Sequence, residues 1–125
     1  MRDGSGDRAI VNITSLVVDK AIPDRLSYAA SKAALQSITR YAASEWGRHG
    51  IRVNAISPGY VDTRLTRWAD DDPRMVAKRQ TLATLPLPRA GTVEDIANAV
   101  LFLASPLSAY VTGHVLRLDS GWHLI

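Results

Sequence analysis

The sequence contains no cysteine. Disulfide bonds and metal sites built from thiolates are therefore excluded, and this composition is compatible with the cytoplasmic location that we expect. The chain also lacks an apolar run long enough for a membrane-spanning helix, and its first nine residues are too polar for a signal peptide. Its three histidines have no metal-binding spacing, so no metal is expected. The net charge of +3 is a small excess from scattered arginines, which makes nucleic acid an improbable partner.

A phosphate-binding glycine loop in its usual context is missing as well. Gly4 and Gly6 flank a serine, but a predicted strand follows them, whereas a dinucleotide-binding loop follows a strand and opens a helix. We therefore predict an ordinary turn there. The 125 residues suffice for one domain, and no internal repeat is visible.

The residues that carry chemistry lie between positions 15 and 32. Tyr28 and Lys32 are four residues apart in a segment, 24–47, that is predicted to be helical with Asp24 as its N-cap, so both side chains rise from one face. Ser15 follows an apolar run, 9–14, that is typical of a short buried strand. A strand end and the start of the next helix meet at the carboxyl edge of a parallel sheet, where open α/β folds bind ligands.

These three residue types suit a reaction between an alcohol and a carbonyl. A free tyrosine hydroxyl titrates near ~10, and a neighbouring ammonium favours its ionised form. Tyr28 is thus a candidate general acid or base, Lys32 the group that tunes it, and Ser15 a hydrogen-bond partner for the substrate oxygen. From the spacing alone, an ordinary surface pair and a serine that merely ends a strand explain the pattern equally well.

Four motifs together resemble the classical short-chain dehydrogenase/reductase family. The serine and the Tyr-x-x-x-Lys spacing match its active-site signature. Three flanking stretches match its strand before the serine, its next strand with a Pro-Gly turn, and its last helix with the approach to the last strand: 10–15, 50–59, and 97–105 with 111–113. The resemblance runs from about residue 8 to residue 121, which is the carboxyl-terminal half of the usual family chain.

The resemblance implies a fold and a cofactor. The expected fold is α/β: the second half of a doubly wound, Rossmann-like parallel sheet, with three strands in sequence order and flanking helices. The cofactor would be NAD or NADP, with Tyr28 and Lys32 near its ribose and the Pro58-Gly59 turn facing the nicotinamide. Val61 would offer backbone groups to the carboxamide, and Thr63 would donate its hydroxyl. By itself, this stretch would be only a Pro-Gly turn followed by a helix cap.

The family's glycine-rich nucleotide-binding half has no counterpart in the sequence. We therefore expect residues 1–125 to form one partial domain, the catalytic half, with Met1 either internal to a longer protein or a start placed too late. The expected function is hydride transfer between NAD(P) and a secondary alcohol or ketone. The alternative is a non-catalytic remnant that keeps the fold and its assembly surface. A basic nucleic-acid-binding protein is a weaker third possibility.

The other segments concern substrate and assembly. Two short helices, roughly 64–70 and 73–83, are expected to form a lid in which Trp68, Met75 and Leu82 either line a substrate pocket or pack the lid down. An apolar stripe on the 24–47 helix, including Ile38 and Tyr41, is expected to be core or subunit interface. By resemblance, a homo-oligomer would form through this helix and the C-terminal helix and strand. The last helix is predicted to begin after Thr92 and the last strand to span 114–118.

Overall fold

The computed structural model describes residues 8–125, so the turn expected at Gly4 and Gly6 lies outside the described residues. Its three strands are β1 (Arg8–Ile13), β2 (Ile51–Pro58) and β3 (Val115–Leu118). Both neighbouring pairs are parallel, and the strand order in the sheet is β1-β2-β3. The predicted three-stranded parallel sheet in sequence order is therefore confirmed.

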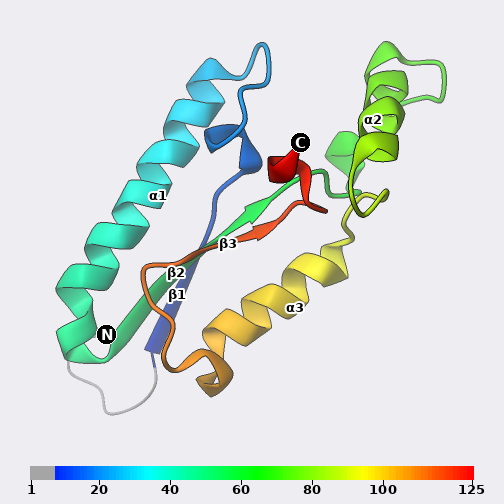
Figure 1. Cartoon of the computed structure of the whole chain (residues 1–125). Helices are drawn as coiled ribbons and strands as arrows, with labels where there is room; N and C mark the ends of the chain where they lie inside the picture. Colours follow the sequence, from blue (N-terminus) through cyan, green and yellow to red (C-terminus); the bar gives the residue numbers. More distant parts are fainter. Residues whose placement is uncertain (1–7) are drawn as a thin grey trace.

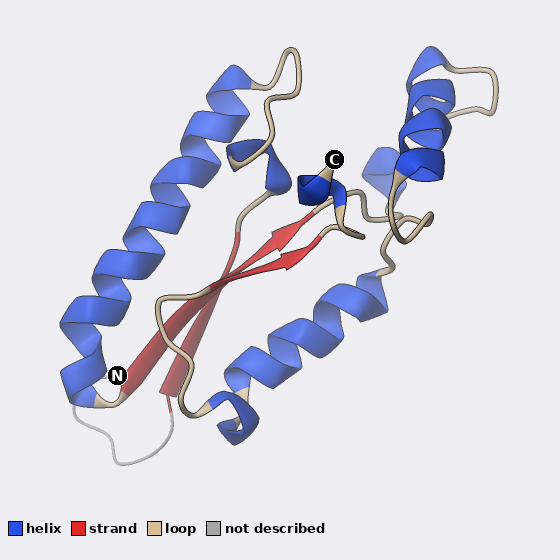
Figure 2. Cartoon of the chain, viewed as in Figure 1, coloured by secondary structure: helices blue, strands red, loops and turns tan. Residues whose placement is uncertain are grey.

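Two helices cover opposite faces of this sheet (Figures 1 and 2). Helix α1 (Leu26–Trp46) packs on β2, and helix α3 (Val93–Ala104) packs on β1 and β2 from the other side. Helix α2 (Pro73–Thr84) stands beyond the arrowheads of the strands, at the carboxyl edge (Figure 1). Five short 3-10 turns complete the structure: η1 (Leu16–Val18), η2 (Gly47–His49), η3 (Arg64–Thr66), η4 (Pro106–Ser108) and η5 (Trp122–Leu124).

Strand β2 is the centre of the core. Residues 51–57 are all buried, and their side chains alternate between the two helical layers. Ile51 and Val53 pack against Ala42 and Ala43 of α1. Arg52 points to the other face. A strand buried on both faces is typical of a parallel α/β sheet.

The ends of two helices form as their sequence predicts. Asp72 caps α2 by accepting a hydrogen bond from the Arg74 amide at 2.8 Å, and Pro73 occupies the first helical position, where a missing N–H costs nothing. Thr92 caps α3 in a reciprocal capping box with Asp95.

The prediction that Asp24 caps α1 is wrong. The cap residue is Arg25, which makes no side-chain capping bond, and Asp24 lies in the left-handed region with φ of 61°. Asp24 therefore belongs to the turn that precedes α1 and is not its N-cap. The last strand, predicted over 114–118, begins at Val115, one residue later than expected.

Two further expectations need correction. The first lid helix, expected over 64–70, is only the single turn η3. The apolar stripe on α1 was expected to be core or subunit interface, and its residues Ile38 and Tyr41 are not core, since they are 58% and 69% exposed; the interface stays a prediction. The face that α1 buries carries Gln36, Thr39, Ala42 and Ala43 instead.

Strand β1, predicted to be a short buried strand, lies at the edge of the sheet and is only partly buried. Among residues 8–125, no helix is both long and apolar enough to cross a membrane.

Candidate active site

The candidate site lies where the three strands end. Thr14, directly after β1, is buried and donates to the Ile56 carbonyl twice, from its amide at 2.7 Å and from its hydroxyl at 2.9 Å. These bonds fix the point at which the chain leaves the sheet. Ser15 therefore emerges at the carboxyl edge, beside the end of β2.

Lys32 joins helix α1 to this strand end. Its Nζ donates to the Ile13 carbonyl at 2.9 Å and lies 5.6 Å from the centroid of the Tyr28 ring. An ammonium has three donors, so this bond leaves two for other partners. Tyr28 is 45% exposed. The structure thus brings Tyr28 and Lys32 together on one helix face, at the carbonyl two residues before Ser15.

Ser15 caps the turn η1. Its Oγ accepts from the Val17 amide at 3.5 Å, a long and weak hydrogen bond. A serine hydroxyl also carries one donor and a second lone pair. Ser15 is therefore held in place by its own turn and keeps a donor for another oxygen.

The Pro58-Gly59 turn crosses the same edge. The Gly59 amide donates to the Leu118 carbonyl at 2.9 Å, which continues the pairing of β2 with β3. A Cβ at this position would lie 2.9 Å from the Cα of Asp119, closer than backbone atoms tolerate. Glycine is thus required here by the close approach of the C-terminal turn.

Val61 and Thr63 follow on the same side. Val61 forms a parallel bridge with Gly91, and its carbonyl accepts from the Thr66 hydroxyl at 2.6 Å. Within residues 8–125 the Val61 amide makes no hydrogen bond. The Thr63 hydroxyl lies 3.4 Å from that of Thr66. The Val61 amide therefore borders the edge without a partner in residues 8–125, whereas the Thr63 hydroxyl is shared with Thr66.

A hollow of about 640 Å³ lies along the segment that connects η1 to the first turn of α1. It is lined by the connecting segment from Val17 to Ala29, and its apolar part includes Ile22 and Leu26. Sequence reasoning placed a possible substrate pocket in the lid helices, 64–70 and 73–83, and did not single out this segment. The signal was available, because the chain that joins two candidate catalytic residues must run beside both.

Two of the three lid side chains proposed as pocket residues, Met75 and Leu82, line one hollow of about 240 Å³, and Trp68 does not line it. Leu82 packs against the buried pair Leu16 and Leu85. The Arg74 guanidinium lies 5.0 Å from the ring of Trp68. Leu82 thus packs the lid down and also lines a hollow, so both alternatives remain open for it.

The root of the lid carries a charge cluster. The Arg67 guanidinium is bonded to Asp62 and lowers the pKa of that carboxyl, and the nearby Lys78 ammonium acts in the same direction. Lys78 is itself buried and donates to the Thr66 carbonyl at 3.0 Å. These bonds tie α2 to the turn that holds Val61. Residues 8–125 contain no group of three or more histidine, aspartate or glutamate side chains that could hold a metal.

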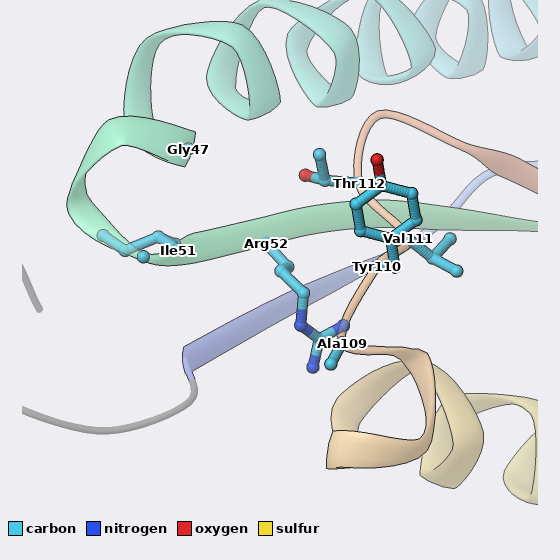
Figure 3. Close-up of a pocket in the computed structure, with 8 residues that line it drawn as sticks. Gly47, Ile51, Arg52, Ala109, Tyr110, Val111 and Thr112 are labelled. Atoms are coloured by element: carbon cyan, nitrogen blue, oxygen red, sulfur yellow. The ribbon is translucent and has the colours of Figure 1, made fainter.

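Another hollow, of about 590 Å³, lies at the opposite end of β2 (Figure 3). The Arg52 side chain extends from β2 toward the loop that carries Ala109 and Tyr110 (Figure 3). Its guanidinium donates to the Leu103 carbonyl at 2.9 Å and to the Ser108 hydroxyl at 2.8 Å. This cation caps the end of α3, so we assign the region a structural role.

The family model described as enoyl-(acyl carrier protein) reductase matches residues 1–123. The chain belongs to the short-chain dehydrogenase/reductase family. It is 44% identical over 113 residues to a 3-oxoacyl-[acyl-carrier-protein] reductase, FabG, of Chlamydia muridarum, covering 90% of this chain and 44% of that one. The chain thus spans about half the length of the curated relatives that it matches.

Solved structures of dehydrogenases superpose on this short-chain dehydrogenase/reductase chain. A protein described as a 2-deoxy-d-gluconate 3-dehydrogenase from Agrobacterium tumefaciens, with bound NADP, has a TM-score of 0.85 at 38% identity, over 95% of this chain and 48% of that one. A 4-hydroxyisoleucine dehydrogenase complexed with NADH has a TM-score of 0.82 at 35% identity, over 91% and 46%. The Rossmann-type fold is therefore shared.

Proposed function

We propose that this sequence carries the catalytic residues of an NAD(P)-dependent oxidoreductase that interconverts a secondary alcohol and its ketone. One observation supports this most directly. Lys32 lies over the ring of Tyr28 and bonds the last carbonyl of β1, so a helix and a strand end present an acid–base group, a cation and the Ser15 hydroxyl at one edge. An ordinary surface pair would need no tether to the strand that delivers the serine.

Each side chain then has a defined task. In reduction, the Tyr28 hydroxyl gives its proton to the substrate oxygen as the carbonyl carbon receives a hydride, and in oxidation the phenolate takes that proton back. Lys32 stabilises the phenolate by its positive charge. Ser15 donates to the substrate oxygen, which gains negative charge as the carbonyl is reduced. The nicotinamide cofactor supplies or accepts the hydride.

The residues present fit such a cofactor at its nicotinamide end. The free amide of Val61 suits a carboxamide oxygen, and the Thr63 hydroxyl is a further donor. The Pro58-Gly59 turn would let a flat ring approach the backbone, and Tyr28 and Lys32 would face the ribose. We assign no residue in 8–125 to the pyrophosphate or adenosine. Relatives with bound NADP and with NADH keep both cofactors in the proposal.

The substrate is proposed to be a small alcohol or ketone and to bind near Ser15 and Tyr28, where the hollow lined by Ile22 and Leu26 adjoins the segment that connects them. The short spacing from Tyr28 to Lys32 resembles the alcohol and ketone branches of the family more than the enoyl-reducing branch. Exposed apolar side chains on α1 and α3, among them Tyr41 and Leu101, support a homo-oligomer built through α1 and the C-terminal helix and strand.

Replacing Tyr28 with phenylalanine tests the proposal. The experiment uses the protein at its natural length. Tyr28→Phe should lower turnover of a secondary alcohol by about 10²–10⁴-fold, because it removes only the transferable proton. Binding of NADH or NADPH, followed as a rise in melting temperature, should persist. Tyr110→Phe, at a fully exposed tyrosine near the amino end of β2, is the control for removing a phenol hydroxyl and should leave turnover unchanged.

Turnover retained by Tyr28→Phe would exclude Tyr28 as the proton carrier. If the unaltered protein shows neither turnover nor a melting shift with either cofactor, the catalytic function is excluded and a non-catalytic protein with the same fold is favoured.

A further inference from the structure

The C-terminal turn η5 packs with the segment after Ser15, with the turn after Gly59 and with the end of α2. Trp122 is 8% exposed and forms one buried cluster with Leu16 and Leu85, joined by the partly buried Ile22 and Leu82. Leu16 directly follows Ser15, and Leu85 directly follows α2. The indole ring is therefore part of one buried cluster with the serine segment and the base of the lid.

The same ring also touches the cofactor-side turn. Trp122 stacks on Tyr60, with ring centroids 4.9 Å apart and an interplanar angle of 20°. Tyr60 stands between Gly59 and Val61, so its ring position governs where the free Val61 amide lies. Offset-stacked aromatic pairs prefer a defined separation and tilt, and this preference limits sliding of one segment past the other.

The turn that presents Trp122 is itself fixed. The Trp122 amide donates to the Asp119 carbonyl at 3.0 Å, and the buried Asp119 carboxylate accepts from the Gly121 and His123 amides. Gly121 has φ of 78°, and a Cβ there would lie 2.9 Å from Pro86. On its outer side the Lys20 ammonium lies 5.7 Å from the indole ring. The indole has little freedom to change its place.

We propose that Trp122 is a positioning residue for the reaction: it holds the Ser15 segment and the Tyr60-Val61 turn at a fixed separation. This inference rests on the proposed function, because it concerns the same site. The indole touches neither candidate catalytic side chain in the cluster described; it acts through Leu16 on Ser15 and through Tyr60 on Val61. Removing it would let the two sides of the site drift apart while each keeps its own residues.

The test compares Trp122→Ala with Trp122→Phe and Leu103→Ala, in the protein at its natural length. Leu103→Ala empties a fully buried site in α3, which ends at the opposite edge of the sheet, and serves as the control for lost stability. We expect Trp122→Ala to lower kcat per folded molecule by about 10–100-fold, since small misplacements of reacting groups are costly. It should also raise the KM for the cofactor. Trp122→Phe retains a stacking ring, so its kcat per folded molecule and its KM for the cofactor should stay close to those of wild type. The same is expected for Leu103→Ala.

Amide hydrogen exchange gives a second measurement that needs no turnover. In Trp122→Ala, exchange should rise in 15–18 and 59–63, and in Leu103→Ala it should not rise there selectively. If Trp122→Ala keeps the kcat of Leu103→Ala, or if exchange in both segments is unchanged, the positioning role is overturned. If the unaltered protein shows neither cofactor binding nor turnover, the proposed function itself is refuted.

Discussion

The two ends of the sheet use polar groups in opposite ways. At the amino end, Arg52 and Asn54 are buried, and their side chains are bonded to carbonyls and an amide of the segments around them. At the carboxyl end, Tyr28 is half-exposed, Lys32 keeps two donors, and the Val61 amide has no partner in residues 8–125.

The difference follows from the cost of burial. An unpaired polar group away from water loses its solvation without compensation, so a buried end must satisfy its groups within the chain. At an open edge, water or a ligand can satisfy the same groups. Arg52 and Asn54 therefore contribute stability, whereas the groups named at the carboxyl end are available for binding and chemistry. The predictions below test whether stability and activity separate in this way.

The largest effect is expected from Lys32→Met. The substitution keeps the length of the side chain and removes the ammonium that stabilises the phenolate, so kcat should fall by about 10²-fold or more. The melting temperature should change little, because the bond to Ile13 is exposed. Steady-state kinetics and thermal melts measure both.

Arg40→Met, two turns further along α1, is the control for removing a cation from this helix. A kcat for Lys32→Met equal to that of Arg40→Met would contradict the role of Lys32 and would make the carboxyl end no different from the rest of the helix.

Arg52→Met should give the opposite result. Its guanidinium donates to the Leu103 and Ser105 carbonyls and to Ser108. Hydrogen bonds to a charged group contribute about 1.5–3 kcal/mol, so the free energy of unfolding should fall by about that much, with kcat per folded molecule unchanged. Chemical denaturation gives the stability, and Arg48→Met, at an exposed position, should change it far less. A loss of kcat without a loss of stability would place function at the amino end.

The sequence was sufficient for much of the scaffold, because the decisive signals are local. The apolar runs predicted the strands, and the spacing of Tyr28 and Lys32 predicted their shared helix face. The residue type of Thr92 and its place before the last helix predicted that it is the N-cap of α3. The same local reasoning failed at Asp24, since the path from η1 into α1 places that residue in a left-handed conformation.

Long-range packing was beyond the sequence. No periodicity links Trp122 to Leu16 or Tyr60, because such contacts depend on how the ends of different strands converge. Arg52 likewise sits in an apolar strand pattern, and only the position of the α3 terminus shows why a cation is tolerated there. The candidate catalytic residues were thus predictable, but the residues that hold them in place were not.

The smallest effect is expected from Asp95→Asn, at the exposed start of α3. The Arg89 guanidinium, followed by the Thr92 amide, lowers the pKa of Asp95 to about 2, whereas an aspartate in an unfolded chain titrates near ~3.9. A lowered native pKa means that the carboxylate stabilises the fold above pH 4 and that this contribution is lost as the pH falls toward 2.

Asp95→Asn should therefore be slightly less stable than wild type at pH 7 but should lose less stability between pH 4 and pH 2. Denaturant titrations at these pH values measure the difference, with Glu94→Gln as the control for removing a charge from the same helical turn. If Asp95→Asn loses as much stability as wild type between pH 4 and pH 2, the ion pair of Arg89 and Asp95 contributes nothing to the stability of the fold. The contribution to stability at the exposed start of α3 would then be smaller still, compared with that of the Arg52 hydrogen bonds at its buried end, than the geometry implies.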